Sequence, residues 1–585
     1  MTKTSKLPSK YDEEDLPDAF RQFFVKKVDD IKDTINAKLE SLNLYQDRFK
    51  PAKPTCKKDK FDHTNEEKVR KLVAKLKDKT CKLDPMPTFL VKKCVNELAP
   101  IITFIINDIF EKGDYPPQLK EATLTPVLKK PSMDTEDLGS FRPVSQNCFL
   151  SKIIDTELHT QMKDYLDKNE LESIYQAGYK ENNSCETMLL TLYDKLYHDY
   201  DTDKAQIVIA LDYSAAFDCL NQDQLVEILN EEFGVEQDAL KVLHSYFKER
   251  RYTIEINQHK SKEQKLTIGS GQGSVMSSMG FSLDVNQLSI IPKKHEQDAY
   301  QYADDVSIRF SFDENEDFEK VSNTIVNCLN DILEFSMIRG LALNSKKTQG
   351  LIIAKQAIRE KWKDLKINFD GKNISFNDDM EILGAIITHD LKQDAFVARR
   401  VSKCIKSLAT LKKLNVKSKE IRHNLAVTLA LSKIDYCNAL LSGSTNKLYE
   451  EYQKAIRSVV RYVCGLRRRD PTSKHMNNLH ILNAKHRVTY KVCNITWKII
   501  TMNEPRMLAN IMPTNKADPR LRSNKDIYKI NKNPKLPTGM TNKRFTFAAE
   551  AFNKLPKHIR EIQNAENFKK HLKTHLFNEQ LTSHT

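Results

Sequence analysis

Two adjacent carboxylates, Asp304 and Asp305, lie between two short segments that alternate apolar and polar residues. Residues 299–301 and 306–310 each alternate apolar and polar residues as a β-strand does, so the sequence predicts a hairpin with both carboxylates near its tip. Neighbouring carboxylates cannot be buried without a compensating cation. The tip of the hairpin therefore either binds a cation or is an exposed turn. For Asp304 and Asp305 considered alone, an exposed turn is the simpler explanation.

A third carboxylate follows the strongest strand pattern of the chain. Residues 206–211 are a nearly continuous apolar run, which predicts a buried strand, and Asp212 comes directly after it. A carboxylate at the end of a buried strand is rigidly positioned and can share a cation with a carboxylate from another strand. The local alternative is that Asp212 caps the N-terminus of the helix that follows.

Cations accompany two short segments upstream of these aspartates. A strand-like run over 122–128 leads into Lys129 and Lys130, and a second segment over 141–145 contains Arg142. Such cations at the ends of two neighbouring segments could clamp a phosphate. Because Lys and Arg are common on protein surfaces, solvated side chains without a ligand explain the same pattern.

A glycine-rich stretch over 269–274 precedes an apolar helical pattern over 275–288. Glycine lets a backbone approach a ligand closely, and the amides that open a helix can face that ligand. The stretch lacks both the Lys-Ser/Thr pair of a P-loop and the glycine spacing of a dinucleotide fingerprint. It is therefore neither of those two nucleotide-binding motifs.

The composition is that of a globular protein, with 585 residues of which 40% are hydrophobic and 29% charged. No apolar run is long enough to cross a bilayer, and the first residues lack the apolar core of a secretory signal, so we expect no membrane association. The 11 cysteines include no Cys-x-x-Cys pair, which favours reduced thiols in an intracellular protein. We expect it in the nucleus, the cytoplasm or both.

Charge is distributed unevenly along the chain. Residues 401–585 contain 36 Lys and Arg against 12 Asp and Glu, whereas residues 1–400 carry a small net negative charge. A basic region of this kind predicts a polyanionic partner, with nucleic acid as the default candidate. A solvated basic helical region without a partner is the alternative.

In chain order, these segments resemble the reverse transcriptases of non-LTR retrotransposons, the LINE-type elements, and especially the jockey-like group. The resemblance rests on an ordered set of motifs and covers most of residues 70–580. Within the polymerase core the resembling segments are 141–145, 211–218, 272–275, 302–305, 343–348 and 383–384. Outside it they are 79–87, 434–438 and 552–556.

Several positions depart from the family pattern. Gly271 stands where proline is usual, and serines at 277 and 278 replace a Gly-Pro pair. Further departures are Asn182, Cys185, Asn221 and Gln222. None of them removes an expected metal ligand. The N-terminal helical pattern over 17–42 resembles the spacer that follows the endonuclease in full-length elements, and the endonuclease itself is expected to be missing from this sequence.

The resemblance implies an α+β fold, a right-hand polymerase with fingers, a palm of antiparallel sheet backed by helices, a helical thumb and a helical C-terminal region. The expected divisions are an N-terminal helix and linker at 1–66, fingers and upstream segment at 67–205, palm at 206–390, a basic thumb and C-terminal region at 391–503, and a Pro-rich linker with C-terminal helices at 504–585. The whole polymerase core is expected at about 112–390.

The resemblance also implies two-metal nucleotidyl transfer, in which divalent cations activate the primer 3′-hydroxyl and stabilise the leaving pyrophosphate. Asp212 and Asp304 are the expected bridging ligands of two Mg²⁺ ions, with Mn²⁺ as an alternative metal. Asp305 is expected to be a looser ligand. The backbone carbonyl of Tyr213 is the expected further oxygen ligand.

Substrate contacts are implied for Lys130, Arg142, Phe217, Gln272, Gly273, Tyr302 and Lys347. Arg142 and Lys130, with Lys129 as the alternative to Lys130, would hold the triphosphate. Phe217 would stack beneath the sugar and exclude a ribose 2′-hydroxyl, although a core aromatic explains it as well. Lys347 is a candidate general acid for pyrophosphate or a solvated surface lysine.

Further contacts are implied with the nucleic acid. Gln272 and Gly273 would form the floor under the templating base pair. The basic region would become a thumb and C-terminal helices that grip an RNA–DNA hybrid through backbone contacts. Its densest cluster is Arg461, Arg467, Arg468 and Arg469.

The sequence thus predicts an RNA-directed DNA polymerase of a retrotransposon, which adds dNTPs to a DNA primer on an RNA template. The alternative is a catalytically decayed or co-opted remnant that binds nucleic acid without polymerising, and the altered loop at 271–278 motivates it. An RNA-dependent RNA polymerase is disfavoured, because Phe217 and the residues at 302–305 look like the reverse-transcriptase versions.

Overall fold

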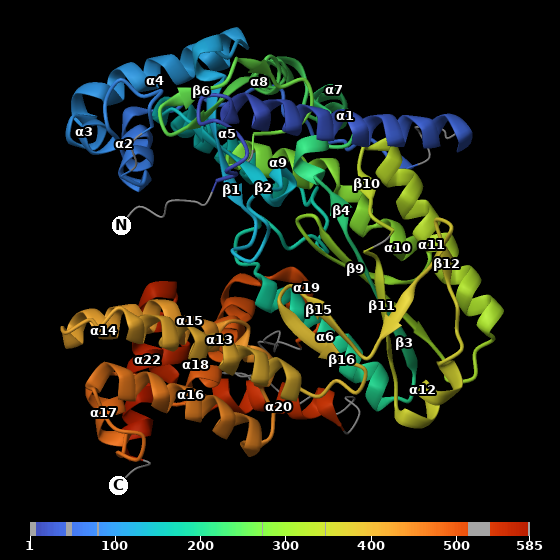
Figure 1. The fold of residues 1–585 in the computed structure, drawn as a ribbon, viewed down its shortest axis with the longest axis vertical. Helices are drawn as coiled ribbons and strands as arrows, with labels where there is room; N and C mark the ends of the chain where they lie inside the picture. Colours follow the sequence, from blue (N-terminus) through green and yellow to red (C-terminus); the bar gives the residue numbers. More distant parts are fainter. Residues whose placement is uncertain are drawn as a thin grey trace, which may run out of the picture. The chain divides into compact units, whose positions relative to one another are not determined.

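The computed structural model describes residues 7–42, 49–78, 81–271, 273–345, 347–512 and 539–582. The chain divides into two compact units, and each unit combines segments that are distant in sequence (Figure 1). The first unit consists of Met1–Tyr179, Asp212–Lys294 and Cys328–Asn344. The second consists of Lys180–Leu211, His295–Asn327 and Ser345–Thr585.

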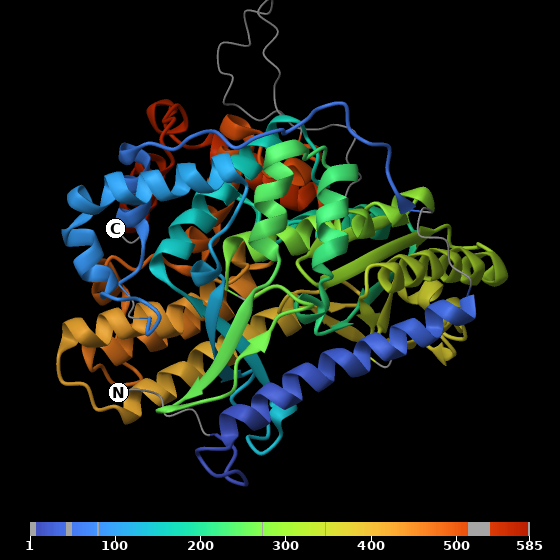
Figure 2. The ribbon, with the colours of Figure 1, turned by 90° about the horizontal axis from the view of Figure 1, so that it is seen from above.

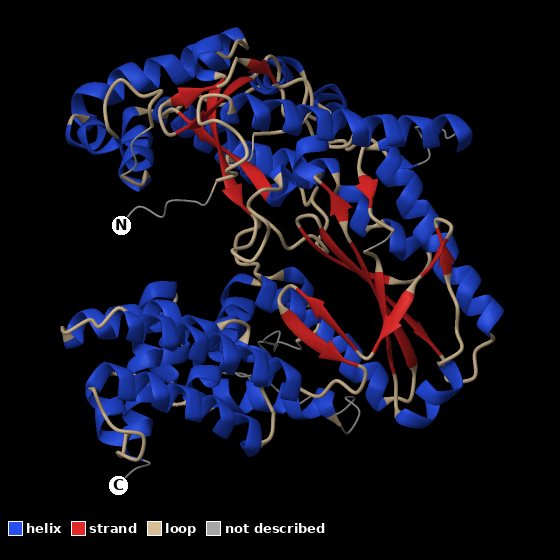
Figure 3. Cartoon of the chain, in the orientation of Figure 1, coloured by secondary structure: helices blue, strands red, loops and turns tan. Residues whose placement is uncertain are grey.

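A five-stranded sheet lies in the second unit and is drawn in red in Figure 3. Its strand order is β14 (Ser375–Asn377), β11 (Gln349–Ile353), β3 (Ala205–Leu211), β9 (Asp305–Phe312) and β8 (Asp298–Tyr302). All neighbours are antiparallel except β11 and β14. β3 is central and buried along almost its whole length, which confirms the buried strand that its apolar run predicts.

Helix α6 (Cys185–Asp201) packs on this sheet against β3 and β8. It begins with a capping box in which Ser184 and Thr187 bond to each other's backbone amides. Near its end, Asp199 accepts a hydrogen bond of 2.5 Å from Arg309, a buried residue of β9. Arg309 also pairs with Asp298 of β8. The Arg309 guanidinium therefore links α6 to the sheet. Its two carboxylate partners also offset the cost of burying its charge.

The rest of the second unit is mainly helical, as its sequence predicts. Helices α13 (Asp394–Lys413), α16 (Asn446–Cys464), α18 (Ala484–Met502), α20 (Met540–Asn553) and α22 (Ala565–Thr582) pack against one another. Trp497 of α18 stacks on Phe568 of α22, with ring centroids 5.1 Å apart. The aromatic pair lies in an apolar core shared by α18, α20 and α22.

The first unit contains a smaller sheet with the strand order β2 (Phe141–Asn147), β1 (Glu121–Leu128), β5 (Arg251–Ile256) and β6 (His259–Lys260). The short strand β7 (Gln264–Lys265) also pairs with β5. β1 is antiparallel to β2 and parallel to β5.

Helix α1 (Leu16–Leu42) packs on this smaller sheet, and Figure 2 shows it as the long blue helix beside the strands. Phe20 is fully buried and meets Phe141 edge to face at 5.1 Å between ring centroids. The helix predicted over 17–42 thus covers a sheet of the same unit.

Helices build a second core in the first unit. They include α2 (Glu66–Lys75), α4 (Val95–Lys112), α5 (Phe149–Lys168), α8 (Gln237–Phe247) and α9 (Val275–Asp284). α9 ends at Asp284, before the end of the helical pattern at 288, and a short 3-10 turn over Asn286–Ser289 follows. None of the described helices combines the length and the apolar character needed to cross a bilayer.

Candidate active site

The predicted hairpin with two carboxylates is confirmed. β8 and β9 pair from Asp298 to Tyr302, and the last pair is Tyr302 with Asp305. Ala303 takes a left-handed conformation with φ of 58°, and its carbonyl accepts a hydrogen bond of 3.1 Å from the side chain of Gln301. Asp304 and Asp305 are exposed at the tip, and Tyr302 is half-buried.

The strand register relates the third carboxylate to this hairpin. The β3–β9 ladder ends with the pair Leu211 and Val306. Asp212 follows Leu211 in the chain, and Asp305 precedes Val306. Chain connectivity therefore brings all three aspartates to one end of the same strand pair. The alternative role of Asp212 as a helix cap is wrong, because the next α-helix, which begins at Gln222, has Asn221 as its N-cap.

The donor set fits a hard divalent cation, because carboxylate oxygens are the ligands that Mg²⁺ prefers. Among the residues that the structure describes, no three His, Cys, Asp or Glu side chains are gathered closely enough to hold a metal ion in this conformation. The aspartates that could hold one are Asp212, Asp304 and Asp305, from the end of β3 and the turn between β8 and β9.

The backbone after Asp212 is held by a two-stranded ladder in the first unit. Tyr213 of β4 (Tyr213–Ser214) pairs with Leu343 of β10 (Ala342–Leu343). The amide of Asn344 donates a hydrogen bond of 2.8 Å to the carbonyl of Asp212. The Tyr213 ring is buried, and its hydroxyl lies 2.9 Å from Ser336 Oγ. Burial raises the pKa of Tyr213 well above its ordinary value, so the phenol remains protonated.

Phe217 lies in a 3-10 turn over Ala216–Cys219, directly after this ladder. Its ring stacks on Phe281 of α9, with centroids 4.1 Å apart, and meets Tyr179 edge to face at 6.0 Å. The Phe217 side chain is half-buried. Packing thus fixes the ring orientation, and the sugar-gate role stays a prediction.

The glycine-rich loop packs directly on the Phe217 segment. The amide of Ser270 donates a hydrogen bond of 3.1 Å to the Phe217 carbonyl, and the amide of Gly269 donates one of 2.7 Å to Leu220. Gly273 has a φ of 127°, and a Cβ there would lie 3.0 Å from the carbonyl oxygen of Ser145. A side chain at 273 would therefore strain the loop backbone. Gln272 lies outside the described residues.

The phosphate-clamp residues lie at the end of the β1–β2 hairpin where the loop over 129–140 connects the two strands. Arg142 is exposed and pairs in register with Val127. The ammonium of Lys129 donates a hydrogen bond of 2.7 Å to the Gly139 carbonyl, so it braces the connecting loop. Lys130 is exposed. Lys130 stays the predicted partner of Arg142, with Lys129 as the alternative.

The predicted site residues divide between the two units. Lys130, Arg142, Asp212, Tyr213, Phe217 and Gly273 belong to the first unit, and Tyr302, Asp304, Asp305 and Lys347 belong to the second. Lys347 is exposed and follows β10.

A buried polar network behind the glycine-rich loop was not visible in the sequence. The hydroxyl of Tyr246 lies 2.9 Å from that of Ser274, the N-cap of α9, and Arg250 donates a hydrogen bond of 3.0 Å to the Tyr246 carbonyl. Asp155 of α5 lies beside them, and burial raises the pKa of its carboxyl. These residues come from three separate segments without a motif, so no sequence pattern could have identified them.

The arginine cluster at the end of α16 has two parts. Arg461 is half-buried and donates a hydrogen bond of 3.4 Å to the Asp470 carbonyl. Arg467, Arg468 and Arg469 are exposed in the segment that follows. The Asp470 carboxylate accepts a hydrogen bond of 2.7 Å from the backbone amide of Arg467, which closes the turn. Only the second part presents its guanidinium groups to solvent.

Residues 127–387 match the family described as reverse transcriptase (RNA-dependent DNA polymerase). Three curated proteins of Drosophila melanogaster are similar to part of the chain. The probable RNA-directed DNA polymerase from transposon BS is 24% identical over 36% of this chain and 23% of that protein. The RNA-directed DNA polymerase from mobile element jockey is 22% identical over 41% of this chain and 27% of that protein.

The third relative, the probable RNA-directed DNA polymerase from transposon X-element, is 22% identical over 31% of this chain and 20% of that protein. The chain therefore covers less than a third of the length of each of these relatives. Among solved structures, apo telomerase from Candida tropicalis truncated from the C-terminal domain aligns with a TM-score of 0.34 and 13% identity, over 51% of this chain and 60% of that one.

Proposed function

We propose that residues 127–387 form a reverse transcriptase domain and that the chain is an RNA-directed DNA polymerase of a non-LTR retrotransposon. The α+β fold expected for this family is confirmed. The observation that carries the proposal is the strand register, in which Leu211 pairs with Val306. That pairing brings Asp212 to the same end of the sheet as Asp305.

Asp212, Asp304 and Asp305 would hold two Mg²⁺ ions, with the Tyr213 carbonyl as a further ligand. Two such ions lower the pKa of a primer hydroxyl and neutralise the charge of a leaving pyrophosphate. A carboxylate at the end of β3 is fixed by the sheet, whereas those of the hairpin lie on a turn. Asp212 would thus be the most rigidly positioned of the three carboxylate ligands.

The chain's cations and its aromatic ring would position the nucleotide. Arg142 and Lys130, at one end of the β1–β2 hairpin, would bind the triphosphate electrostatically. Phe217, whose ring is fixed by Phe281, would lie under the sugar and exclude a ribose 2′-hydroxyl. Lys347 would donate a proton to the departing pyrophosphate.

Gly273 and its neighbour Gln272 would form the floor under the templating pair, and Tyr302 would contact the incoming nucleotide. The basic region would hold an RNA–DNA hybrid through Arg467, Arg468 and Arg469, which are exposed, with Arg461 supporting their turn. The partners are therefore an RNA template and a DNA primer, and the proposed location is the nucleus, the cytoplasm or both.

Primer extension on poly(rA)/oligo(dT) tests this function. The purified chain should incorporate dTTP in a Mg²⁺-dependent reaction, and Asp212→Asn or Asp304→Asn should lower the rate at least about a hundredfold. Asp313→Asn is the matched control, because Asp313 is exposed just beyond the opposite end of β9. Tight, salt-sensitive binding of primer–template without incorporation would instead identify a nucleic-acid-binding remnant.

The sugar gate is tested separately by Phe217→Ala. The smaller side chain should admit ribonucleotides, so the preference for dTTP over UTP should fall at least about tenfold. Phe281→Leu is the control, because it removes the stacking partner and keeps the Phe217 ring. An unchanged preference in Phe217→Ala would assign Phe217 to packing alone.

A further inference from the structure

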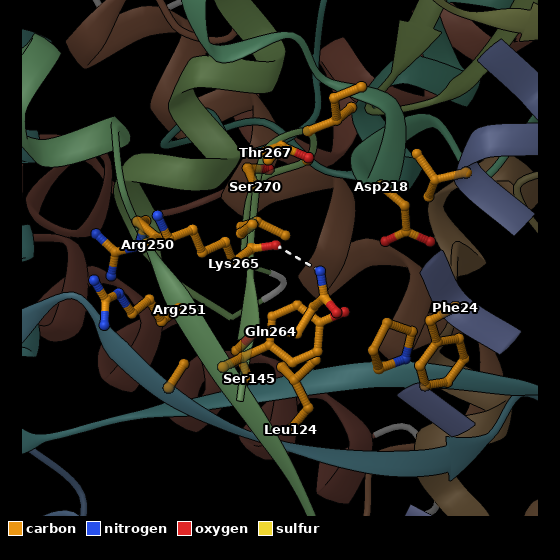
Figure 4. A pocket seen from close by; sticks show the side chains of 18 of the residues that line it. Phe24, Leu124, Ser145, Asp218, Arg250, Arg251, Gln264, Lys265, Thr267 and Ser270 are labelled. Atoms are coloured by element: carbon orange, nitrogen blue, oxygen red, sulfur yellow. Dashed lines mark hydrogen bonds between the residues drawn. The ribbon is translucent and has the colours of Figure 1, made fainter. Parts of the chain in front are cut away.

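A pocket with a cavity volume of about 100 Å³, open to solvent, lies in the first unit between α1 and the sheet that contains β1, β2 and β5 (Figure 4). The lining residues include none of the aspartates, cations or aromatic side chains assigned above to metal and nucleotide. The pocket therefore borders the candidate active site through the glycine-rich loop, without containing those side chains.

One wall of the pocket is apolar and partly aromatic. α1 contributes Phe24 and Val28, β1 contributes Leu124, β5 contributes Tyr252, and the loop after β7 contributes Ile268. Leu124 and Tyr252 are more than nine-tenths buried. Such a wall favours a flat, apolar ring system as ligand. A flat ring that lies against the wall buries apolar surface of both the ring and the protein.

Two cations lie directly opposite each other on the pocket lining. Arg251 of β5 and Lys265 of β7 are register partners in an antiparallel ladder. Like charges in that position repel each other. The ion pair of Arg251 with Glu263, at 3.1 Å, is half exposed and offsets little of this repulsion. An anion between the two side chains would relieve it.

Two buried polar atoms of the lining have no hydrogen-bond partner among the residues that the structure describes. They are Asn147 Oδ1 and Ser270 Oγ, and both side chains are more than nine-tenths buried. Leaving such atoms unpaired costs free energy. A ligand with a hydrogen-bond donor for Asn147 and a polar group for Ser270 would recover that cost.

We propose that this pocket binds a flat aromatic anion. Its rings would lie on the wall of Phe24 and Tyr252, its acidic group between Arg251 and Lys265, and its hydrogen-bond donor at Asn147 Oδ1. Figure 4 shows the two cationic side chains on the side of the pocket opposite Phe24.

Occupancy of the pocket would be transmitted to the active-site loop. Gly269 and Ser270 line the pocket, and their amides donate hydrogen bonds to Leu220 and Phe217. A ligand against this backbone would restrict the segment that leads to Gly273, so it would slow nucleotide addition. This consequence rests on the proposed function, whereas binding does not.

Fluorescence titration of the full chain tests binding directly. Anilinonaphthalene sulfonate, an aromatic anion, and phenylnaphthylamine, its neutral analogue, should each bind saturably at one site per chain. Val25→Trp should fill the pocket and weaken both probes at least about tenfold, because Val25 lines it. Lys26→Trp is the matched control, since Lys26 is the exposed neighbour on the same helix.

The charge is tested by Lys265→Glu, which changes an exposed side chain and should leave folding intact. Sulfonate affinity should fall about tenfold, and phenylnaphthylamine affinity should stay within about twofold of wild type. Equal effects on the two probes would overturn the anion assignment. Unchanged binding of both probes in Val25→Trp would overturn the pocket assignment.

Competition identifies the source of the ligand. Displacement of the sulfonate by adenosine monophosphate would make the natural ligand a nucleotide, and displacement by naphthoate alone would make it an aromatic acid without a sugar. Failure of both competitors to displace the sulfonate would overturn the proposal. Because none of these titrations measures polymerisation, an inactive enzyme that binds the probes refutes only the proposed function.

Discussion

Replacement of Gly273 by alanine isolates the effect of the glycine-rich loop. The backbone at 273 has a φ of 127°, which side-chain-bearing residues rarely adopt, and a Cβ would lie 3.0 Å from the Ser145 carbonyl oxygen. Alanine must therefore shift the loop or strain it, at a cost on the order of 1–3 kcal/mol. The Ser145 backbone cannot move away easily, because Ser145 pairs with Leu124 within the β1–β2 ladder.

If that cost reduces the population of the active loop conformation, kcat/KM for dTTP falls roughly 5- to 150-fold. Gly271→Ala is the matched control. Its Cβ would meet only the flexible Ser145 side chain, at 3.3 Å, and Gly271 is not in the positive-φ region. Its kcat/KM should stay within about twofold of wild type.

Single-nucleotide primer extension on an RNA template measures both variants, and far-ultraviolet circular dichroism confirms that they are folded. Wild-type kcat/KM in Gly273→Ala would refute the reasoning, because the strained backbone would then have no connection to nucleotide addition. An equal loss in Gly271→Ala would also refute it, since the effect would follow from added volume alone.

Three further predictions concern stability and binding. Arg309→Met leaves the carboxylates of Asp199 and Asp298 without their buried partner, so it should destabilise the sheet by about 3–5 kcal/mol in chemical unfolding. Burial raises the pKa of Asp284 to about 7, so this group favours the folded state at low pH and loses that contribution as the pH rises from about 4 through about 7. Asp284→Asn should therefore be more stable than wild type at pH 8 and gain nothing at pH 4, and equal gains at both pH values would contradict the pKa assignment. Arg468→Gln should reduce the slope of log K against log salt for primer–template binding by about 1, without changing sequence preference, as measured by fluorescence anisotropy.

Local patterns predicted the elements that carry the proposed chemistry. The apolar run at 206–211 and the alternation around Asp304 each involve only residues that are close in sequence. These patterns were therefore sufficient to predict β3 and the β8–β9 hairpin. Antiparallel pairing of the two then followed from the expected palm. The helices of the basic region likewise formed where apolar residues recur at helical spacing.

Contacts between distant segments could not be predicted in the same way. Nothing local to α1 indicates that Phe20 packs on Phe141, more than a hundred residues away. The hydrogen bond from Lys129 reaches a carbonyl across the β1–β2 connection, and the network of Asp155, Tyr246 and Ser274 joins three separate segments. The expected domain divisions also stay predictions. Each compact unit combines segments from several of the expected divisions, so the units do not correspond to them one to one.

The central claim is that Asp212 and the hairpin aspartates together hold the metal ions of a polymerase. Electron paramagnetic resonance titration with Mn²⁺, in the presence of primer–template and a non-hydrolysable dNTP, measures this most directly. We expect two ions per chain in the wild type and in Asp313→Asn, and fewer than two in Asp212→Asn and in Asp304→Asn. Two ions in all four proteins would contradict the claim.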